Sequence, residues 1–305
     1  MGIFSLTTLS TMAEKAVKPY WQDVQVVEVN KEYPRTSFMT YNNRADALSG
    51  KFERSKYYRL LNGTWKFYFV DSYKKLPENI TDPNTNTDSW DDIQVPGNWE
   101  VQGHGIAIYT NHGYEFKPRN PQPPALPEAN PVGVYRRDID IPADWDGRDI
   151  YLHLAGAKSG VYVYINGQEA GYWPYGYNSF YVDATPYLKP GEKNELAVRL
   201  ENERESSRWY PGAGLYRNVH LVVTEDVHIP TWGTVITTPV VEDGFARVNV
   251  KTDLVMPEGK NVGNYRIVTE ILNPEGKRIS SDDRPGDKLD GNFFNQNFVV
   301  YRPSL

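Results

Sequence analysis

Over most of the chain, apolar and polar residues alternate with a period of two in short runs that end at turn residues. Trp65, Phe67 and Phe69 form one such run, directly after an Asn62-Gly63 pair. Because successive side chains of a β-strand point to opposite faces, this run predicts a half-buried strand. Similar runs cover residues 150–154, 161–165, 196–200 and 219–223. The pattern predicts antiparallel sheets, and no long helical pattern accompanies it.

A proline-rich segment separates the early strands from the later ones, with six prolines in residues 118–131. Proline cannot donate to a strand ladder, which excludes a central strand here. Strand-like sequence of the same type stands on both sides, so we expect an ordered surface loop rather than a linker. Several short strands with long inserted loops are typical of an all-β, jelly-roll β-sandwich.

A second series of alternating runs follows Glu225, over residues 234–238, 246–254 and 265–272. Its spacing favours an immunoglobulin-like β-sandwich of about 100 residues. Fewer residues than that remain, so we expect an incomplete sandwich with an unpaired edge. The predicted organisation is a leader or signal-peptide remnant over 1–19, a jelly-roll sandwich over 20–225 and a truncated immunoglobulin-like sandwich over 226–305.

The composition, 39% hydrophobic and 24% charged, is typical of a soluble globular protein. No apolar run is long enough for a membrane span, and a net charge of -6 offers no basic footprint for nucleic acid. The absence of cysteine excludes disulfides and thiolate sites. An apolar stretch at residues 3–9 precedes small residues, which favours a signal-peptide tail over a disordered leader. We therefore expect a periplasmic or secreted protein, with the cytoplasm as the alternative.

The residues that could carry chemistry form no catalytic or metal-binding motif. No Gly-x-Ser-x-Gly, P-loop or dinucleotide-binding turn occurs, and the histidines do not stand at metal-ligand spacing. His153 and His220 fall inside strand patterns and are expected to be ordinary sheet residues. Glu201, Glu203 and Glu205 share one face of a predicted strand, where mutual repulsion indicates a solvated face rather than an acid and a base. We expect no catalytic residue and no metal ligand in this chain.

Three motifs follow one another along the chain: Val95-Pro96-Gly97-Asn98-Trp99-Glu100, Ile108-Tyr109-Thr110-Asn111 and Asn130-Pro131-Val132-Gly133-Val134-Tyr135-Arg136-Arg137. With residues 61–67 upstream and 160–171 and 208–217 downstream, they closely resemble the sugar-binding domain of the glycoside hydrolase family 2 β-galactosidases. The resemblance covers nearly the whole chain from Tyr20 on. Members of this family continue into a (β/α)₈ barrel that carries both catalytic glutamates of a retaining mechanism. Nothing in this sequence resembles that barrel.

The resemblance suggests four substrate-binding residues. The Asn that helps to bind galactose in the β-galactosidases corresponds to Asn111, whose amide can both donate and accept a hydrogen bond. A turn-forming Asn is the alternative. Tyr175 stands where the larger β-galactosidases have an Asp, and the stretch around Arg208 and Trp209 looks more like other branches of family 2. These three residues could line the rim of a sugar site or simply pack in the sandwich.

The resemblance implies the N-terminal portion of a β-galactosidase that hydrolyses terminal β-D-galactosides, and a chain that is inactive alone. Its partners would be a β-galactoside or related glycan and the barrel domain, and the full-length enzyme could form a homo-oligomer. We expect a fragment or a prematurely ended reading frame. No cofactor is expected in this chain, and any Mg, Na or Ca would belong to the absent barrel. The alternatives are a free-standing carbohydrate-binding module and the front end of a β-glucuronidase or β-mannosidase relative.

Overall fold

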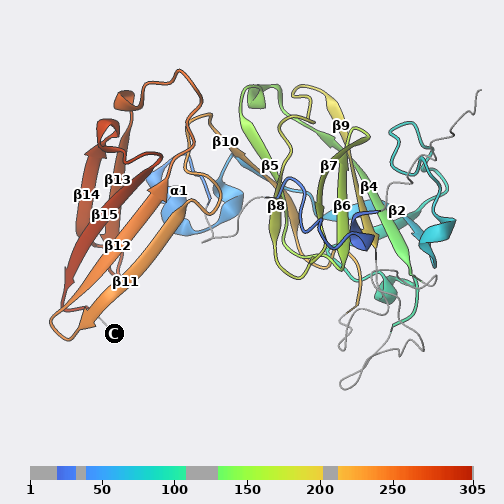
Figure 1. Cartoon of the computed structure of the whole chain (residues 1–305), viewed down its shortest axis with the longest axis horizontal. Coiled ribbons are helices and arrows are strands. Elements are labelled where there is room, and N and C mark those ends of the chain that lie inside the picture. The colour runs from blue at the N-terminus through green and yellow to red at the C-terminus, as the bar shows by residue number, and fades with distance from the viewer. Residues whose placement is uncertain (1–18, 32–38, 108–129, 202–211, 304–305) are drawn as a thin grey trace, which may run out of the picture.

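The computed structural model describes residues 19–31, 39–107, 130–201 and 212–303. In these residues the regular secondary structure is mostly antiparallel β-strand, with one short α-helix, α1 (Arg44–Ser49). Short 3₁₀ helices lie at Tyr20–Gln22, Phe52–Arg54, Tyr73–Lys75, Glu100–Gln102, Ala143–Trp145, Val262–Asn264 and Gly286–Lys288. Within the described ranges, no helix has the length and apolar character needed to cross a membrane. Figure 1 shows two groups of sheets, side by side along the long axis.

The first group is a sandwich of two sheets, which confirms the expected jelly-roll architecture. The six-stranded sheet has the order β3 (Asp91–Val95), β2 (Gly63–Val70), β4 (Val132–Asp140), β9 (Lys193–Glu201), β6 (Gly160–Ile165) and β7 (Gln168–Trp173). The four-stranded sheet has the order β1 (Tyr58–Leu60), β10 (Val219–Thr224), β5 (Asp149–Leu154) and β8 (Phe180–Asp183). Apolar side chains from both sheets, among them Trp65, Phe67 and Leu152, form one buried core between them. The predicted alternation in β2 therefore points Trp65 and Phe67 inward.

The opposite face of the six-stranded sheet is also covered over much of its area. Ile80 and Trp90, from the segment before β3, form a second buried cluster with Val132 and Val134 of β4. Near the far edge of the sheet, the ring of Tyr20 stacks on the ring of Tyr162 in β6, with the two ring centroids 5.6 Å apart. Two extra layers of chain therefore bury residues that an isolated sandwich would expose.

This covering contradicts the solvated face predicted for the glutamates at the end of β9. Glu201 is only 3% exposed. Its Oε1 lies 3.2 Å from Nε of Arg199, two positions back on the same face of the strand. A buried carboxylate is favoured when a cation accompanies it, and Arg199 supplies that cation. Glu203 and Glu205 lie outside the described residues.

The predicted hairpin at Asn166-Gly167 joins β6 to β7. Both residues have a left-handed backbone conformation, with φ of 51° for Asn166 and 76° for Gly167. The Asn166 amide donates to Tyr187 O at 2.9 Å and to Asn194 Oδ1 at 2.8 Å. Its own Oδ1 accepts from Glu195 N at 3.0 Å. The side chain thus ties the turn to the first residues of β9 and to the loop before them.

Replacing Asn166 with alanine is expected to lower the free energy of unfolding by about 2 kcal/mol. The three lost hydrogen bonds contribute about 1 kcal/mol each at most, and alanine resists a left-handed backbone. Asn166→Gly removes the same hydrogen bonds but permits the positive φ, so its loss should be about 1 kcal/mol smaller. Urea unfolding of both variants measures the difference. Equal losses would show that backbone conformation contributes nothing at this turn.

The second group pairs a three-stranded sheet with a two-stranded one. The first has the order β11 (Thr234–Glu242), β12 (Phe245–Asp253) and β15 (Phe293–Tyr301), and the second contains β13 (Arg266–Leu272) and β14 (Arg278–Pro285). Their shared interior holds Ala246, Val250, Phe294 and Phe298, together with the fully buried amide of Gln296. Thr269 Oγ1 donates to that amide oxygen at 2.5 Å. A buried amide with partners restricts the register between β13 and β15.

Strand β11 is longer than predicted. The sequence indicated residues 234–238, whereas the strand continues to Glu242 across an irregularity between Thr237 and Val240. Pro239 lies inside that irregularity and cannot donate to β12. Pairing resumes at Val240, opposite Arg247. Proline is tolerated at this position because β11 is an edge strand, with β12 as its neighbour in the sheet.

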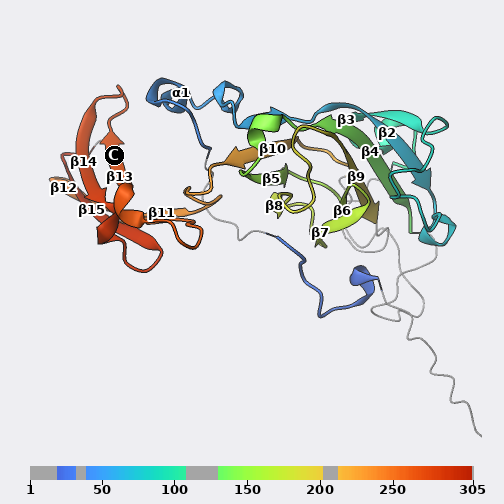
Figure 2. The same ribbon diagram turned by 90° about the horizontal axis from the view of Figure 1, so that it is seen from above.

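The two groups meet at a junction, and the view from above shows them at opposite ends of the molecule (Figure 2). The ring of Trp232, just before β11, meets the ring of Tyr181 in β8 edge-on, with centroids 4.7 Å apart. On the other side, Arg44 of α1 forms an ion pair of 2.7 Å with Glu270 of β13. One buried aromatic contact and one surface ion pair therefore lie at this junction.

A histidine pair lies beneath the same junction. Nδ1 of His153 in β5 is 2.9 Å from Nε2 of His220 in β10, so one imidazole donates to the other. The His153 ring also stacks on Tyr181 at 4.0 Å. Burial lowers the pKa of His153 to about 3 and that of His220 to about 4. Both histidines occupy sheet positions, as predicted, and both are held neutral.

Candidate functional site

Of the four substrate-binding residues predicted from the sequence, the structure describes one. Asn111, Arg208 and Trp209 lie outside the described residues. Tyr175 lies in the loop between β7 and β8, where 53% of its surface is exposed. Its ring is 5.2 Å from that of Tyr177. The structure therefore places Tyr175 on an open loop but does not test its grouping with the other three.

Two of the sequence motifs lie side by side close to this loop. Gly97 N donates to Leu215 O at 2.8 Å, and Trp99 N donates to Ala213 O at 3.0 Å. The carboxylate of Glu100 accepts from Ala213 N, with both oxygens at 3.0 Å. These bonds join segments more than a hundred residues apart in the chain. The Pro-Gly-Asn-Trp-Glu motif and the Gly-Ala-Gly-Leu motif thus form one backbone unit.

The loop of Tyr175 is attached to the same unit through residues 157–158. Lys158 N donates to Gly214 O at 3.1 Å, and Ala157 N donates to Gly176 O at 2.8 Å. A Cβ at Gly176 would lie 1.8 Å from Ala157 O, so no larger residue fits there. Gly214 has φ of +120°, and a Cβ would lie 2.7 Å from Gly97 O. Glycines at these two positions allow three chain segments to approach closely.

Two buried aromatic side chains, Trp99 and Tyr135, lie beneath this unit and are called the aromatic floor below. Trp99 is 1% exposed, and a Cβ at Gly133 would lie 2.3 Å from its ring. The hydroxyl of the fully buried Tyr135 accepts from Leu215 N at 3.4 Å. Burial raises the pKa of Tyr135, so the hydroxyl stays protonated. Nothing in this floor can ionise at neutral pH, and its role is to hold the segments above it.

The phenols of Tyr175 and Tyr216 lie at the surface of the unit, where they can contact a ligand. Burial raises the pKa of the Tyr216 hydroxyl, and the neighbouring Arg217 opposes this rise. The phenol hydroxyls of Tyr175 and Tyr216 can each donate and accept a hydrogen bond. Within the described ranges, no three His, Cys, Asp or Glu side chains are grouped so that they could hold a metal ion. The hydroxyl groups of this arrangement suit recognition of a polar ligand.

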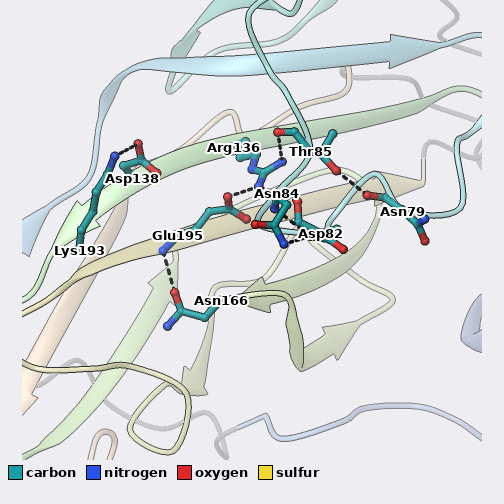
Figure 3. Close-up of polar contacts among 9 residues, drawn as sticks. All are labelled: Asn79, Asp82, Asn84, Thr85, Arg136, Asp138, Asn166, Lys193 and Glu195. Carbon is teal, nitrogen blue, oxygen red and sulfur yellow. Dashed lines mark hydrogen bonds and ion pairs between the residues drawn. The ribbon is translucent and has the colours of Figure 1, made fainter.

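The sequence did not indicate a second polar site, on the outer face of the six-stranded sheet. A cavity of about 400 Å³ lies there, lined by the ends of β2, β4 and β9 and by residues 83–87. Arg136 is 5% exposed and donates to Asp82 O at 2.7 Å and Thr85 O at 3.2 Å (Figure 3). Its guanidinium also pairs with Glu195 of β9. Alternation places Arg136 on the face opposite Tyr135, but only the register with β9 shows its partner.

Comparison with known protein families gives one consistent result. Residues 58–225 match the family described as "Glycosyl hydrolases family 2, sugar binding domain". The chain is 32% identical over 267 residues to β-galactosidase BoGH2A of Bacteroides ovatus, covering 86% of this chain and 29% of that protein. It is 31% identical over 219 residues to a β-galactosidase of Priestia megaterium, covering 69% of this chain and 21% of that protein. The chain thus spans less than a third of either relative.

Solved structures show the same fold. A glycosyl hydrolase family 2 member from Bacteroides cellulosilyticus superposes with a TM-score of 0.63 at 23% identity, covering 81% of this chain and 31% of that one. A Bifidobacterium dentium β-glucuronidase, complexed with coumarin-3-O-glucuronide, gives a TM-score of 0.64 at 16% identity, covering 88% of this chain and 44% of that one. At these identities the similarity concerns the fold alone.

Proposed function

The chain belongs to glycoside hydrolase family 2, and on that premise we propose that it is the N-terminal portion of a retaining β-galactosidase. In this proposal the barrel domain of the longer enzyme carries both catalytic glutamates, and the present chain supplies contacts on the substrate side. The observation that carries the proposal is the backbone unit of residues 97–100, 157–158 and 212–215, which anchors the exposed loop of Tyr175. Asn111, Arg208 and Trp209 flank this unit in sequence and would complete the rim.

The choice of galactose rests on the matched relatives, both of which are named β-galactosidases. Tyr175 favours the alternative of a β-glucuronidase or β-mannosidase relative, because the larger β-galactosidases have an Asp at that position. A phenol offers sugar hydroxyls a single oxygen, whereas a carboxylate accepts hydrogen bonds at two oxygens. If Tyr175 contacts the sugar, selectivity among glycosides would depend on its single hydroxyl and on Asn111.

The longer enzyme that contains this chain is expected to hydrolyse nitrophenyl β-galactoside faster than nitrophenyl β-glucuronide. Asn111→Ala in that enzyme should lower kcat/KM for the galactoside about ten- to a hundredfold, since one or two hydrogen bonds to the sugar are lost. Asn84→Ala is the matched control, because its amide donates to Oδ1 of the nearby Asp82 at 3.0 Å and its loss should leave kcat/KM unchanged. Steady-state kinetics on both substrates give the answer.

Three results would contradict parts of this proposal. Faster turnover of the β-glucuronide than of the β-galactoside would replace the assigned substrate by a uronide. Turnover of either substrate by the purified 305-residue chain alone would show that catalytic carboxylates lie within it. An unchanged kcat/KM for Asn111→Ala would remove this residue from the substrate site.

A further inference from the structure

Strands β7 and β8 follow one another in the chain but are edge strands of two different sheets, β7 of the six-stranded sheet and β8 of the four-stranded sheet. Residues 29–31 lie along both edges. Val29 forms an antiparallel bridge with Tyr172 of β7, and Lys31 forms one with Val182 of β8. We call residues 29–31 the strap; they belong to the dark blue segment that runs past β8 and β7 (Figure 1). The strap therefore connects the two sheets near both ends of the β7–β8 loop.

Asn30, in the middle of the strap, holds both edge strands with one side chain. Its amide nitrogen donates to Ala170 O of β7 at 2.8 Å and to Asp183 O of β8 at 3.1 Å. The Asn30 backbone is left-handed, with φ of 48°. A Cβ at Gly171 of β7 would lie 3.3 Å from Val29 O, so the glycine permits the close approach of the strap. These contacts fix the separation of the two strands.

Lys31 contacts the residue from which the β7–β8 loop begins. Its Nζ lies 4.5 Å from the ring centroid of Trp173, the last residue of β7, and 3.1 Å from Oε2 of Glu28. The Lys31 side chain is 6% exposed, and a cation–π contact shielded from water is stronger than a surface one. The Trp173 ring also faces that of Phe180, the first residue of β8, with centroids 6.3 Å apart. In the part of the chain that the structure describes, Trp173 Nε1 is buried without a hydrogen-bond partner, so contacts of the ring set its orientation.

Tyr175 lies between two fixed points of this loop. After it, Gly176 O accepts from Ala157 N at 2.8 Å. Before it, Pro174 follows Trp173, and the proline ring restricts the backbone between the indole and the phenol. Loosening Trp173 would therefore free the chain on one side of Tyr175 and leave the other side attached.

We propose that Asn30 and Lys31 are positioning residues, which hold the base of the β7–β8 loop and so fix the place of the Tyr175 phenol. Neither residue needs to touch a ligand for this. That the phenol meets a substrate rests on the proposed function, whereas the effect of the strap on the loop is a property of this chain alone.

The test is amide hydrogen exchange of residues 175–179 in the 305-residue chain. Asn30→Gly removes both side-chain hydrogen bonds but permits the left-handed backbone, and Lys31→Met removes the cation but keeps an unbranched stem. Each should speed exchange in the loop about tenfold, because local opening becomes more frequent. Amides of β4 and β9, in the centre of the six-stranded sheet, should exchange as before. Val27→Ala, two positions before the strap and 63% exposed, is the matched control and should change neither.

Lys31→Arg distinguishes a role of the cation from a role of the stem. A guanidinium also binds the face of an indole, so this variant should restore slow exchange in the loop. In the longer enzyme, Lys31→Met should raise KM for nitrophenyl β-galactoside about three- to tenfold with kcat little changed, and Lys31→Arg should restore KM. If Tyr175→Ala leaves KM unchanged there while the loop still responds to Lys31→Met, the positioning role is supported and the proposed substrate contact is contradicted.

Three outcomes would overturn the positioning role. One is unchanged exchange of residues 175–179 in both Asn30→Gly and Lys31→Met. Another is faster exchange that extends equally to β4 and β9, since the substitutions would then weaken the whole sandwich rather than the loop. The last is equal exchange in Lys31→Arg and Lys31→Met, which would show that the cation does not hold Trp173. Urea unfolding of each variant establishes that the comparison is made between folded proteins.

Discussion

Trp99→Ala should lower the free energy of unfolding by about 3 to 5 kcal/mol, the largest effect we expect from one side chain. Trp99 is 1% exposed. Its ring packs against those of Phe67 and Phe69, with ring centroids 5.8 Å and 5.7 Å away. Gly133 lies directly beneath it and has no side chain that could fill the space left by the ring. The cavity would therefore remain open, and denaturant unfolding should show the whole expected decrease in the free energy of unfolding.

A nearby residue provides the matched control. Val101, two positions along, is 81% exposed, so Val101→Ala should change the unfolding free energy by less than about 0.5 kcal/mol. A loss below about 1 kcal/mol for Trp99→Ala would mean that the floor can collapse around the missing ring. Since the Trp99 backbone also holds Ala213, we expect the variant to loosen residues 212–215 before it unfolds globally.

Acid should destabilise the chain more steeply than its carboxylates alone would predict. His153 and His220 have pKa values of about 3 and about 4 in the folded state, well below the ordinary value of 6.5. The unfolded chain therefore binds more protons than the folded one as the pH falls below 6.5, and stability declines until the pH reaches the folded pKa values. Between pH 7 and pH 4.5 the two histidines together should cost on the order of 3 to 5 kcal/mol.

The double variant His153→Leu/His220→Leu isolates this contribution. Leucine can occupy the apolar surroundings of Tyr58, Tyr181 and Trp232 but cannot be protonated. The pH dependence of its unfolding free energy should be shallower than that of the original chain between pH 4.5 and 7, and similar above pH 7. Parallel curves over the whole range would mean that the imidazoles are exposed to solvent and not buried as a pair.

Alternation predicted which residues of a strand share a face, and this part of the fold is confirmed. Trp65 and Phe67 are buried in the core, and Asn166-Gly167 forms the predicted turn. Alternation cannot show what covers a face. The outward residues of β4 and β9 are buried by segments that no periodic pattern connects to them, and Glu201 was placed in solvent for this reason.

The candidate site was predicted through motifs rather than through chemistry. The motifs around Trp99 and Gly214 identified two segments that the structure brings together, although nothing in their spacing required this. Arg136 stood inside a quoted motif, yet its pairing with Glu195 depends on the register of β4 against β9. Such cross-strand contacts join residues far apart in the chain, so local sequence carries no signal for them. The roles of Asn111, Arg208 and Trp209 remain predictions.

The irregularity in β11 has a consequence for how copies of the chain behave at high concentration. An edge strand with exposed Val235 and Ile236 presents free backbone groups on which another strand could add. The irregularity between Thr237 and Val240, which contains Pro239, interrupts the regular strand along this edge. An incoming strand could therefore pair over only a few residues before losing its ladder. The feature that makes β11 irregular thus also guards against sheet extension and aggregation.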